Sequence, residues 1–169
     1  WQLPDGTQER PIPGSRLTAA TPRKPAKRSY ENLPGHGLLA TYYADITLTR
    51  EVSKRLEATV SRSWGLESPL PGPVPEDAWS MRMEGTITPP ETGDYVFVAT
   101  IDDGARLFID GKAAFEDWKD GMERRVQSAA IRLEKGSKVS IRLEYYDEGL
   151  DLARTMTFSD VRDLGGRRV

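Results

Sequence analysis

The chain has 169 residues, of which 37% are hydrophobic and 30% charged, enough for one domain with a sizeable core and a further segment. It contains no cysteine, which excludes disulfides and thiolate chemistry, and its net charge of −2 without a basic patch argues against nucleic-acid binding. No stretch is apolar enough to span a membrane, and none has the pattern of a signal peptide.

The first 37 residues differ in charge from the rest of the chain. They carry six Lys or Arg against three Asp or Glu, whereas the remainder carries 18 against 23, so the net charges are +3 and −5. Residues 18–36 are rich in proline and basic residues, and we expect an extended linker there. Because the chain begins at Trp1 in the middle of a sequence pattern, we expect it to be a piece of a longer protein.

From residue 37 onward, apolar residues recur at every second position, which is typical of half-buried β-strands. Trp79, Met81 and Met83, for example, alternate with Ser80 and Arg82. Turn residues separate the apolar segments. The expected strands are Gly37–Asp45, Val60–Trp64, Trp79–Gly85, Asp94–Ile101, Ala105–Asp110, Ala113–Trp118, Val126–Leu133, Lys138–Tyr146 and Ala153–Phe158.

Two segments between these strands are expected to be loops. In Ile46–Thr59, three apolar residues (Leu48, Val52 and Leu56) lie four positions apart, which favours a loop with one helical turn. Glu67–Glu76 contains four prolines and a glycine, so it should form a surface loop.

Eight to ten short strands with almost no helix predict an all-β fold, an antiparallel β-sandwich or barrel with an extended N-terminal segment. Its core should consist of the inward-facing apolar and aromatic residues: Tyr42, Trp64, Trp79, Met81, Met83, Tyr95, Phe97, Leu107, Ile109, Ile131, Leu133, Ile141, Leu143 and Tyr145.

We expect Val96–Gly111 to form a hairpin, and this segment is the most informative part of the chain about function. Asp102, Asp103 and Gly104 form its turn, and the two adjacent carboxylates repel each other. Solvent, a basic side chain such as Arg106, or a hard cation that takes oxygen ligands could offset that repulsion. A solvated turn and a calcium site are therefore both open alternatives.

Several segments of the chain follow one another in a specific order and spacing. They are Gly37–Tyr43 (Gly-Leu-x-x-x-Tyr-Tyr), Trp64-Gly65, Trp79–Gly85, Pro89–Phe97, Asp102–Gly111 (Asp-Asp-Gly-x-Arg-Leu-x-Ile-Asp-Gly), Glu116-Asp117-Trp118, Glu144-Tyr145-Tyr146 and Ala153-Arg154. This series, over about residues 37–160, resembles the PA14 domain, the lectin-like β-sandwich named for the N-terminal region of anthrax protective antigen.

The resemblance implies a calcium-dependent sugar site. In the lectins of this family the paired Asp residues hold a calcium ion, often with a cis peptide bond between them, and the ion coordinates vicinal sugar hydroxyls. Carried over, the metal and ligand-binding residues are Asp102 and Asp103, and the loop after the Glu-Tyr-Tyr strand offers Asp147 and Asp151 as further metal ligands. Of the aromatic residues near the site, an exposed Tyr146 or Trp118 could stack on a pyranose ring, and the alternative for Trp118 is a place in the core.

The resemblance favours a non-catalytic carbohydrate-binding module of a larger secreted or cell-surface protein, with a glycan and other domains of the parent chain as partners. The alternative is a structural or protein-interaction module of a tandem multidomain protein, adhesin, toxin or glycosidase, in which Asp103 accepts backbone N–H bonds and Asp102 pairs with Arg106. An enzyme is not expected, because the single histidine, His36, lies at the linker boundary and no cysteine is present.

The N-terminal residues resemble the end of a PA14 domain. The residues concerned are Trp1, Pro4, Ile12, Pro13, Ser15 and Leu17. One hypothesis is that residues 1–17 are the terminal strand of a preceding repeat, and the alternative is an unrelated extension. The expected organisation is therefore residues 1–17, the linker at 18–36, and a PA14-like domain over 37–169.

Overall fold

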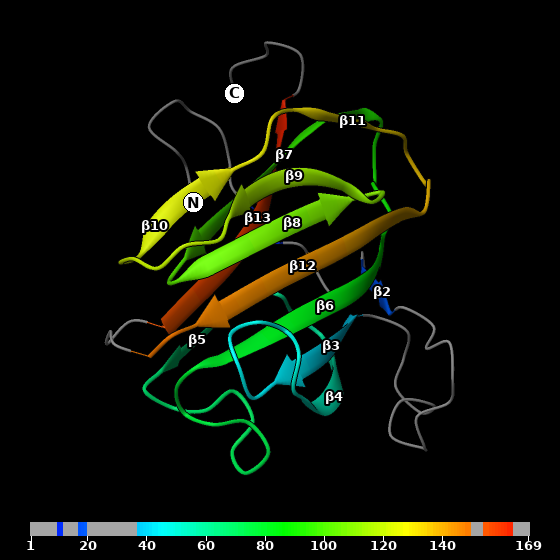
Figure 1. The fold of residues 1–169 in the computed structure, drawn as a ribbon. Helices are drawn as coiled ribbons and strands as arrows, with labels where there is room; N and C mark the ends of the chain where they lie inside the picture. The colour runs from blue at the N-terminus through cyan, green and yellow to red at the C-terminus, as the bar shows by residue number, and fades with distance from the viewer. Residues whose placement is uncertain (1–9, 12–16, 20–36, 150–153, 164–169) are drawn as a thin grey trace.

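The computed structural model of the chain describes residues 10–11, 17–19, 37–149 and 154–163. In these residues there is no helix, and thirteen strands form two antiparallel sheets that pack face to face (Figure 1). The all-β sandwich expected from the sequence is therefore confirmed. No helix long and apolar enough to cross a membrane is found among the described residues.

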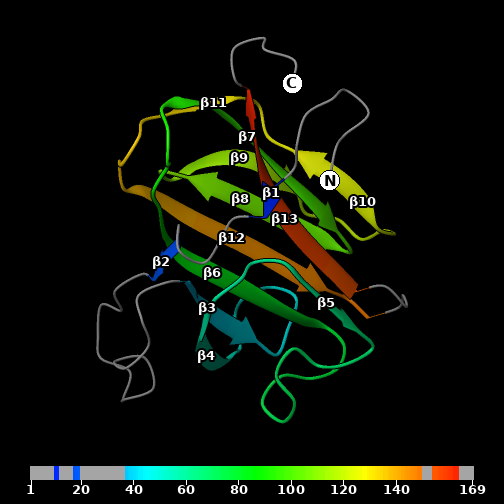
Figure 2. The same cartoon turned by 180° about the vertical axis from the view of Figure 1, so that it is seen from behind.

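The larger sheet has seven strands in the order β4-β3-β6-β12-β8-β9, with β2 beside β6. These strands are β2 Leu17–Ala19, β3 Leu38–Tyr43, β4 Glu51–Glu57, β6 Trp79–Ile87, β8 Gly104–Ile109, β9 Lys112–Asp117 and β12 Val139–Asp147. The other sheet has six strands in the order β1-β13-β7-β10, with β11 beside β7 and β5 beside β13; Figure 2 shows it from its outer side, with β13 in front. Its strands are β1 Arg10–Pro11, β5 Arg62–Gly65, β7 Gly93–Ile101, β10 Arg124–Gln127, β11 Ile131–Leu133 and β13 Arg154–Asp163.

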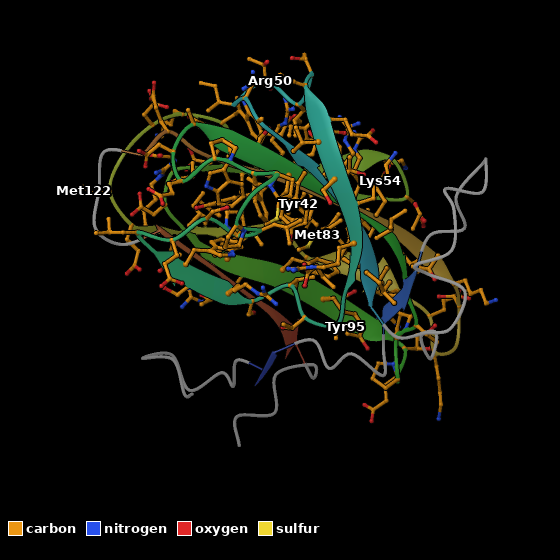
Figure 3. All side chains as sticks on the ribbon, turned by 90° about the horizontal axis from the view of Figure 1, so that it is seen from below. Tyr42, Arg50, Lys54, Met83, Tyr95 and Met122 are labelled. Atoms are coloured by element: carbon orange, nitrogen blue, oxygen red, sulfur yellow. The ribbon has the colours of Figure 1, made fainter. Side chains whose placement is uncertain are left out.

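The core lies between the two sheets and follows the alternation of the sequence. Trp79, Met81 and Met83 of β6 are buried, whereas Glu84 between the strand's inward positions is exposed. Figure 3 shows Tyr42 and Met83 in the interior of the sandwich. Of the expected core residues, all are buried except Ile131, which is half-buried against the core. Period-two burial of large side chains thus drives the two sheets together.

Three expectations about the strands were wrong. The segment Val96–Gly111 is not a hairpin, because β7 and β8 lie in different sheets and the Asp-Asp-Gly turn crosses from one sheet to the other. Residues 51–57 form the edge strand β4 rather than a loop with a helical turn, and β4 pairs with β3 from Leu38↔Glu57 to Tyr43↔Glu51. A spacing of four also fits a strand, because it equals two strand periods, so it places Val52 and Leu56 on one face. The expected strand Val126–Leu133 is divided into β10 and β11, which both pair with β7.

Ser128 causes this division. Its backbone N–H donates to the carbonyl of Phe97 at 2.9 Å, while its hydroxyl accepts the N–H of Phe97 at 3.0 Å and donates to the carbonyl of Ala129 at 2.6 Å. The side chain therefore takes over a ladder bond that the backbone of a continuous strand would make.

The described parts of the N-terminal segment pair with both sheets. Arg10 lies opposite Asp160 of β13, and Leu17 lies opposite Ile87 of β6. Residues 1–9, 12–16 and 20–36 lie outside the described residues, and these include most of the linker predicted at 18–36. The first two residues of that predicted linker, Thr18 and Ala19, belong to β2 and pair with β6. Whether residues 1–17 come from a preceding repeat stays a prediction.

Candidate functional site

The Asp-Asp-Gly turn joins β7 to β8 at one end of the sandwich. Asp102 and Asp103 are both buried, and the peptide bond between them is cis, the form that the resemblance implies. The N–H of Asp102 donates to the carbonyl of Thr155 at 3.1 Å, and its own carbonyl accepts a bond from the hydroxyl of Tyr145. The turn is thus attached to β13 of one sheet and to β12 of the other.

An aromatic cluster lies beneath the turn. The ring centroids of Trp64 and Trp79 are 5.1 Å apart in an edge-to-face arrangement, and both lie 5.5 Å from the ring of Tyr145. These three side chains come from β5, β6 and β12, so they connect the two sheets. Because Tyr145 bonds the carbonyl of Asp102, this rigid part of the core fixes the backbone of the turn.

The carboxylate of Asp103 connects three loops. Its Oδ1 accepts the backbone N–H of Gly121, from the β9–β10 loop, at 3.1 Å. Its Oδ2 accepts the backbone N–H of Glu148, from the β12–β13 loop, at 2.9 Å. Charge-assisted bonds of this kind are stronger than neutral ones, so Asp103 holds the β9–β10 loop and the start of the β12–β13 loop against the β7–β8 turn.

Two more acidic side chains lie beside Asp103. Hydrogen bonding with Asp120 raises the pKa of Glu148, and the charge of Asp103 adds to this effect. The hydroxyl of Tyr146 donates to Oδ1 of Asp120 at 2.5 Å, and burial, reinforced by that bond, raises the pKa of Tyr146. Three loops thus bring carboxylates into one electronegative region, with oxygen donors of the kind that a hard cation prefers.

The carboxylates are near one another but do not form a ready coordination shell. Within the part of the chain that the structure describes, no group of three or more His, Cys, Asp or Glu is arranged to hold a metal ion. Asp103, Asp120 and Glu148 have the donor chemistry for calcium, and a bound ion would have to replace the contact between Glu148 and Asp120.

The two predicted aromatic residues pack on each other beside the turn. Their ring centroids are 4.7 Å apart, and the guanidinium of Arg106 lies 4.0 Å from the ring centroid of Trp118. Trp118 is half-buried, whereas Tyr146 is only 4% exposed. The expectation that Tyr146 is an exposed stacking surface was therefore wrong: its ring fills the space next to Gly104, and only its hydroxyl reaches the acidic region.

Arg106 forms an ion pair with Glu144 of β12 and not with a carboxylate of the turn. Its guanidinium contacts Glu144 of β12 at 2.7 Å, and Arg82 of β6 contacts the other oxygen of Glu144 at 2.8 Å. Arg106 and Glu144 are direct cross-strand neighbours, which explains the pairing. The guanidinium that the sequence suggested for Asp102 is thus used on the outer face of the larger sheet.

The sequence also predicted two metal ligands in the loop after the Glu-Tyr-Tyr strand, and the structure describes one of them. Asp147 ends β12, is buried and lies opposite Trp79, whereas Asp151 lies outside the described residues. Sequence reasoning missed Asp120 and Glu148 as individual site residues. Asp120 belongs to an Asp-Gly pair, a turn signal that follows the Glu-Asp-Trp segment after one residue, and this signal could have pointed to it.

Comparisons with known proteins give a family and a fold. The PA14 domain model matches residues 34–162. The anti-sigma-I factor RsgI3 of Acetivibrio thermocellus is 32% identical over 129 residues, which are 76% of this chain and 20% of that protein. A solved anti-sigma factor domain-containing protein from Clostridium clariflavum is 30% identical with a TM-score of 0.70, covering 88% of this chain and 50% of its own.

A solved PA14 sugar-binding domain from an RTX adhesin shares the fold at 16% identity, with a TM-score of 0.55, covering 79% of this chain and 93% of its own. The chain spans about a fifth of the curated relative and half of the solved anti-sigma factor protein.

Proposed function

Because the chain belongs to the PA14 domain family, we propose that it is a non-catalytic module that binds carbohydrate at the end of the sandwich carrying the Asp102–Asp103 turn. The proposed setting is outside the cell, as part of a larger secreted or cell-surface protein. The PA14 sugar-binding domain of the RTX adhesin, which shares the fold of this chain, supports the proposal of carbohydrate binding.

The observation that carries the proposal is the convergence of three loops on Asp103. Its carboxylate fixes Gly121 and Glu148, and these contacts bring Asp120 and Glu148 into the same region. Acidic groups held this close repel each other, so a divalent cation would stabilise the arrangement.

Calcium, when bound, would supply a hard centre for vicinal sugar hydroxyls. Asp103, Asp120 and Glu148 would hold it. Asp102 and Asp147, which the sequence also suggested as ligands, are both buried. The chain's own contribution is to fix these oxygens on a rigid base and to exclude water on the side of Tyr146. Trp118, half-buried at the rim, remains the candidate for contact with a sugar ring.

Calcium titration of the full chain tests the proposal. We expect a rise in melting temperature in excess calcium, because a free calcium concentration of 100 times Kd stabilises the native state by about 2.7 kcal/mol. A glycan array run with and without chelator should then show calcium-dependent binding. A chain that binds neither calcium nor any glycan would contradict the proposal.

Glu148→Gln is the sharpest variant for this test. Glu148 is exposed, so an isosteric amide should leave the fold intact while removing one anionic oxygen donor. Glu134→Gln is the matched control, because Glu134 is also exposed but follows β11 at the other end of β7. Calcium affinity should fall in Glu148→Gln and stay unchanged in Glu134→Gln.

One observation favours a second function, that of a structural or protein-interaction module. Each carboxylate oxygen of Asp103 accepts a backbone N–H, so the residue has a structural use that does not depend on a cation. In that case calcium would change neither the melting temperature nor any binding property. The names of the two anti-sigma relatives favour a regulatory parent protein over an adhesin, toxin or glycosidase. An assay for binding of a sigma factor by the full-length parent protein would test this alternative.

A further inference from the structure

The guanidinium of Arg124 donates hydrogen bonds to the backbone of the loop that carries Asp120. The residue begins β10 and lies opposite Ile101, and its side chain is 22% exposed. Its Nη2 donates to the carbonyl of Lys119 at 2.9 Å, and its Nη1 donates to the carbonyls of Gly121 at 3.2 Å and Met122 at 3.4 Å. One guanidinium therefore satisfies three carbonyls of the β9–β10 loop.

A carboxylate on the preceding strand fixes the guanidinium itself. Nε of Arg124 donates to Oδ2 of Asp117, the last residue of β9, at 2.9 Å. This bond holds the pKa of Asp117 below its usual value and raises that of Arg124. Because Asp117 lies in a strand, the guanidinium is attached to the sheet, and the loop is attached to the guanidinium.

The contacts of Arg124 determine where Asp120 lies. Asp120 stands between Lys119 and Gly121, whose carbonyls both accept bonds from Arg124. On the opposite side of the same loop, the N–H of Gly121 donates to Asp103. The loop is thus fixed from two sides, and its tip projects outward with Met122 79% exposed, as Figure 3 shows at one end of the molecule.

We propose that Arg124 is a positioning residue of the sugar and cation site, which holds the β9–β10 loop so that Asp120 and Gly121 face Asp103 before any ligand binds. This inference rests on the proposed function. A loop that is ordered in advance does not lose conformational entropy on binding, so Arg124 raises affinity without touching the ligand.

The experiment measures calcium binding by the full chain and by three variants. Arg124→Lys keeps the positive charge but cannot reach three carbonyls and Asp117 together. Asp117→Asn leaves Arg124 in place and weakens its attachment to β9, together with the 3.7 Å contact between Asp117 and Lys119. Arg132→Lys is the matched control, because Arg132 is 65% exposed and pairs with Asp94 near the other end of β7.

We expect calcium affinity to fall about tenfold in Arg124→Lys, since the entropy lost on ordering a single loop residue corresponds to about a tenfold change in affinity. The loss should be smaller in Asp117→Asn and absent in Arg132→Lys. Hydrogen exchange of the amides at 119–123 should accelerate in the same order, which reports on the loop itself.

Two outcomes would overturn the inference, and they differ in what else they reject. If Arg124→Lys lowers the melting temperature but binds calcium as tightly as the natural chain, Arg124 serves the fold alone and the proposed function stands. If the natural chain binds no calcium, the cation site fails and the inference fails with it.

Discussion

Gly104 is the residue of the Asp-Asp-Gly turn at which a minimal substitution should have the largest effect. A Cβ added there would lie 2.2 Å from Cε1 of Tyr146 and 2.9 Å from its Cδ1 and Cζ. Carbon atoms in contact are normally about 3.5–4.0 Å apart, so the ring would have to move by roughly 1 Å or more. Trp118 and the bond to Asp120 hold that ring in place.

Gly104→Ala should therefore destabilise the domain by about 1–3 kcal/mol, the usual cost of inserting an atom into a packed interior. For a chain of this length the melting temperature should fall by about 2–12 °C. Gly93→Ala is the control, because its added Cβ would come no closer than 4.0 Å to Tyr95. We expect that control to change stability by less than about 0.5 kcal/mol.

A double-mutant cycle with Tyr146→Ala separates the clash from other causes. If the clash is responsible, Gly104→Ala should cost much less once the ring is absent, with a coupling energy of about 0.5–3 kcal/mol. Urea unfolding of the four proteins gives these values. Equal costs in both backgrounds, or a Gly104→Ala as mild as Gly93→Ala, would refute the reasoning.

Two further predictions concern charged groups outside the site. Glu144→Gln should lower the urea stability by about 1–3 kcal/mol, because it leaves the guanidiniums of Arg82 and Arg106 without their buried counter-charge, although both remain partly solvated. Asp45→Ala should cost about 1–2 kcal/mol at pH 7. Burial alone would raise the pKa of Asp45, but hydrogen bonds from Thr49 and other donors of its loop hold that pKa well below the usual range. The stabilisation by Asp45 is therefore fully present above about pH 4, the pKa in the unfolded chain, and is lost as the pH falls through the lowered pKa of the folded state. The stability difference between Asp45→Ala and the natural chain should shrink in acid, and a constant difference from pH 7 to pH 2 would contradict this.

The parts of the fold that depend on local alternation could be predicted from the sequence, and those that depend on register could not. The inward face of β6 was readable because Trp79, Met81 and Met83 alternate with polar residues. The strand β4 was not, because a spacing of four does not distinguish a strand from a helical turn. The partner of Arg106 depends on which residue of β12 lies opposite it, and no local pattern contains that information.

The same distinction holds for the site. Asp102, Asp103 and Gly104 were identifiable because they are consecutive and belong to a recognisable motif. Asp120 and Glu148 come close to Asp103 only because the β9–β10 and β12–β13 loops bend toward the β7–β8 turn. Loop conformation of this kind is set by backbone bonds and by Arg124, and these contacts become visible only in three dimensions.

The structural and the cation-binding use of Asp103 do not exclude each other. A carboxylate has about four lone-pair positions, and the N–H groups of Gly121 and Glu148 occupy one on each oxygen. Each oxygen therefore keeps a lone-pair position for a cation, and the backbone bonds fix the orientation of the carboxylate. A variant of Asp103 would disturb the loops and the cation together and could not separate the two uses. Glu148→Gln leaves both backbone bonds of Asp103 in place, and its amide can still donate a hydrogen bond to Asp120, so calcium affinity in that variant discriminates between a binding module and a purely structural one.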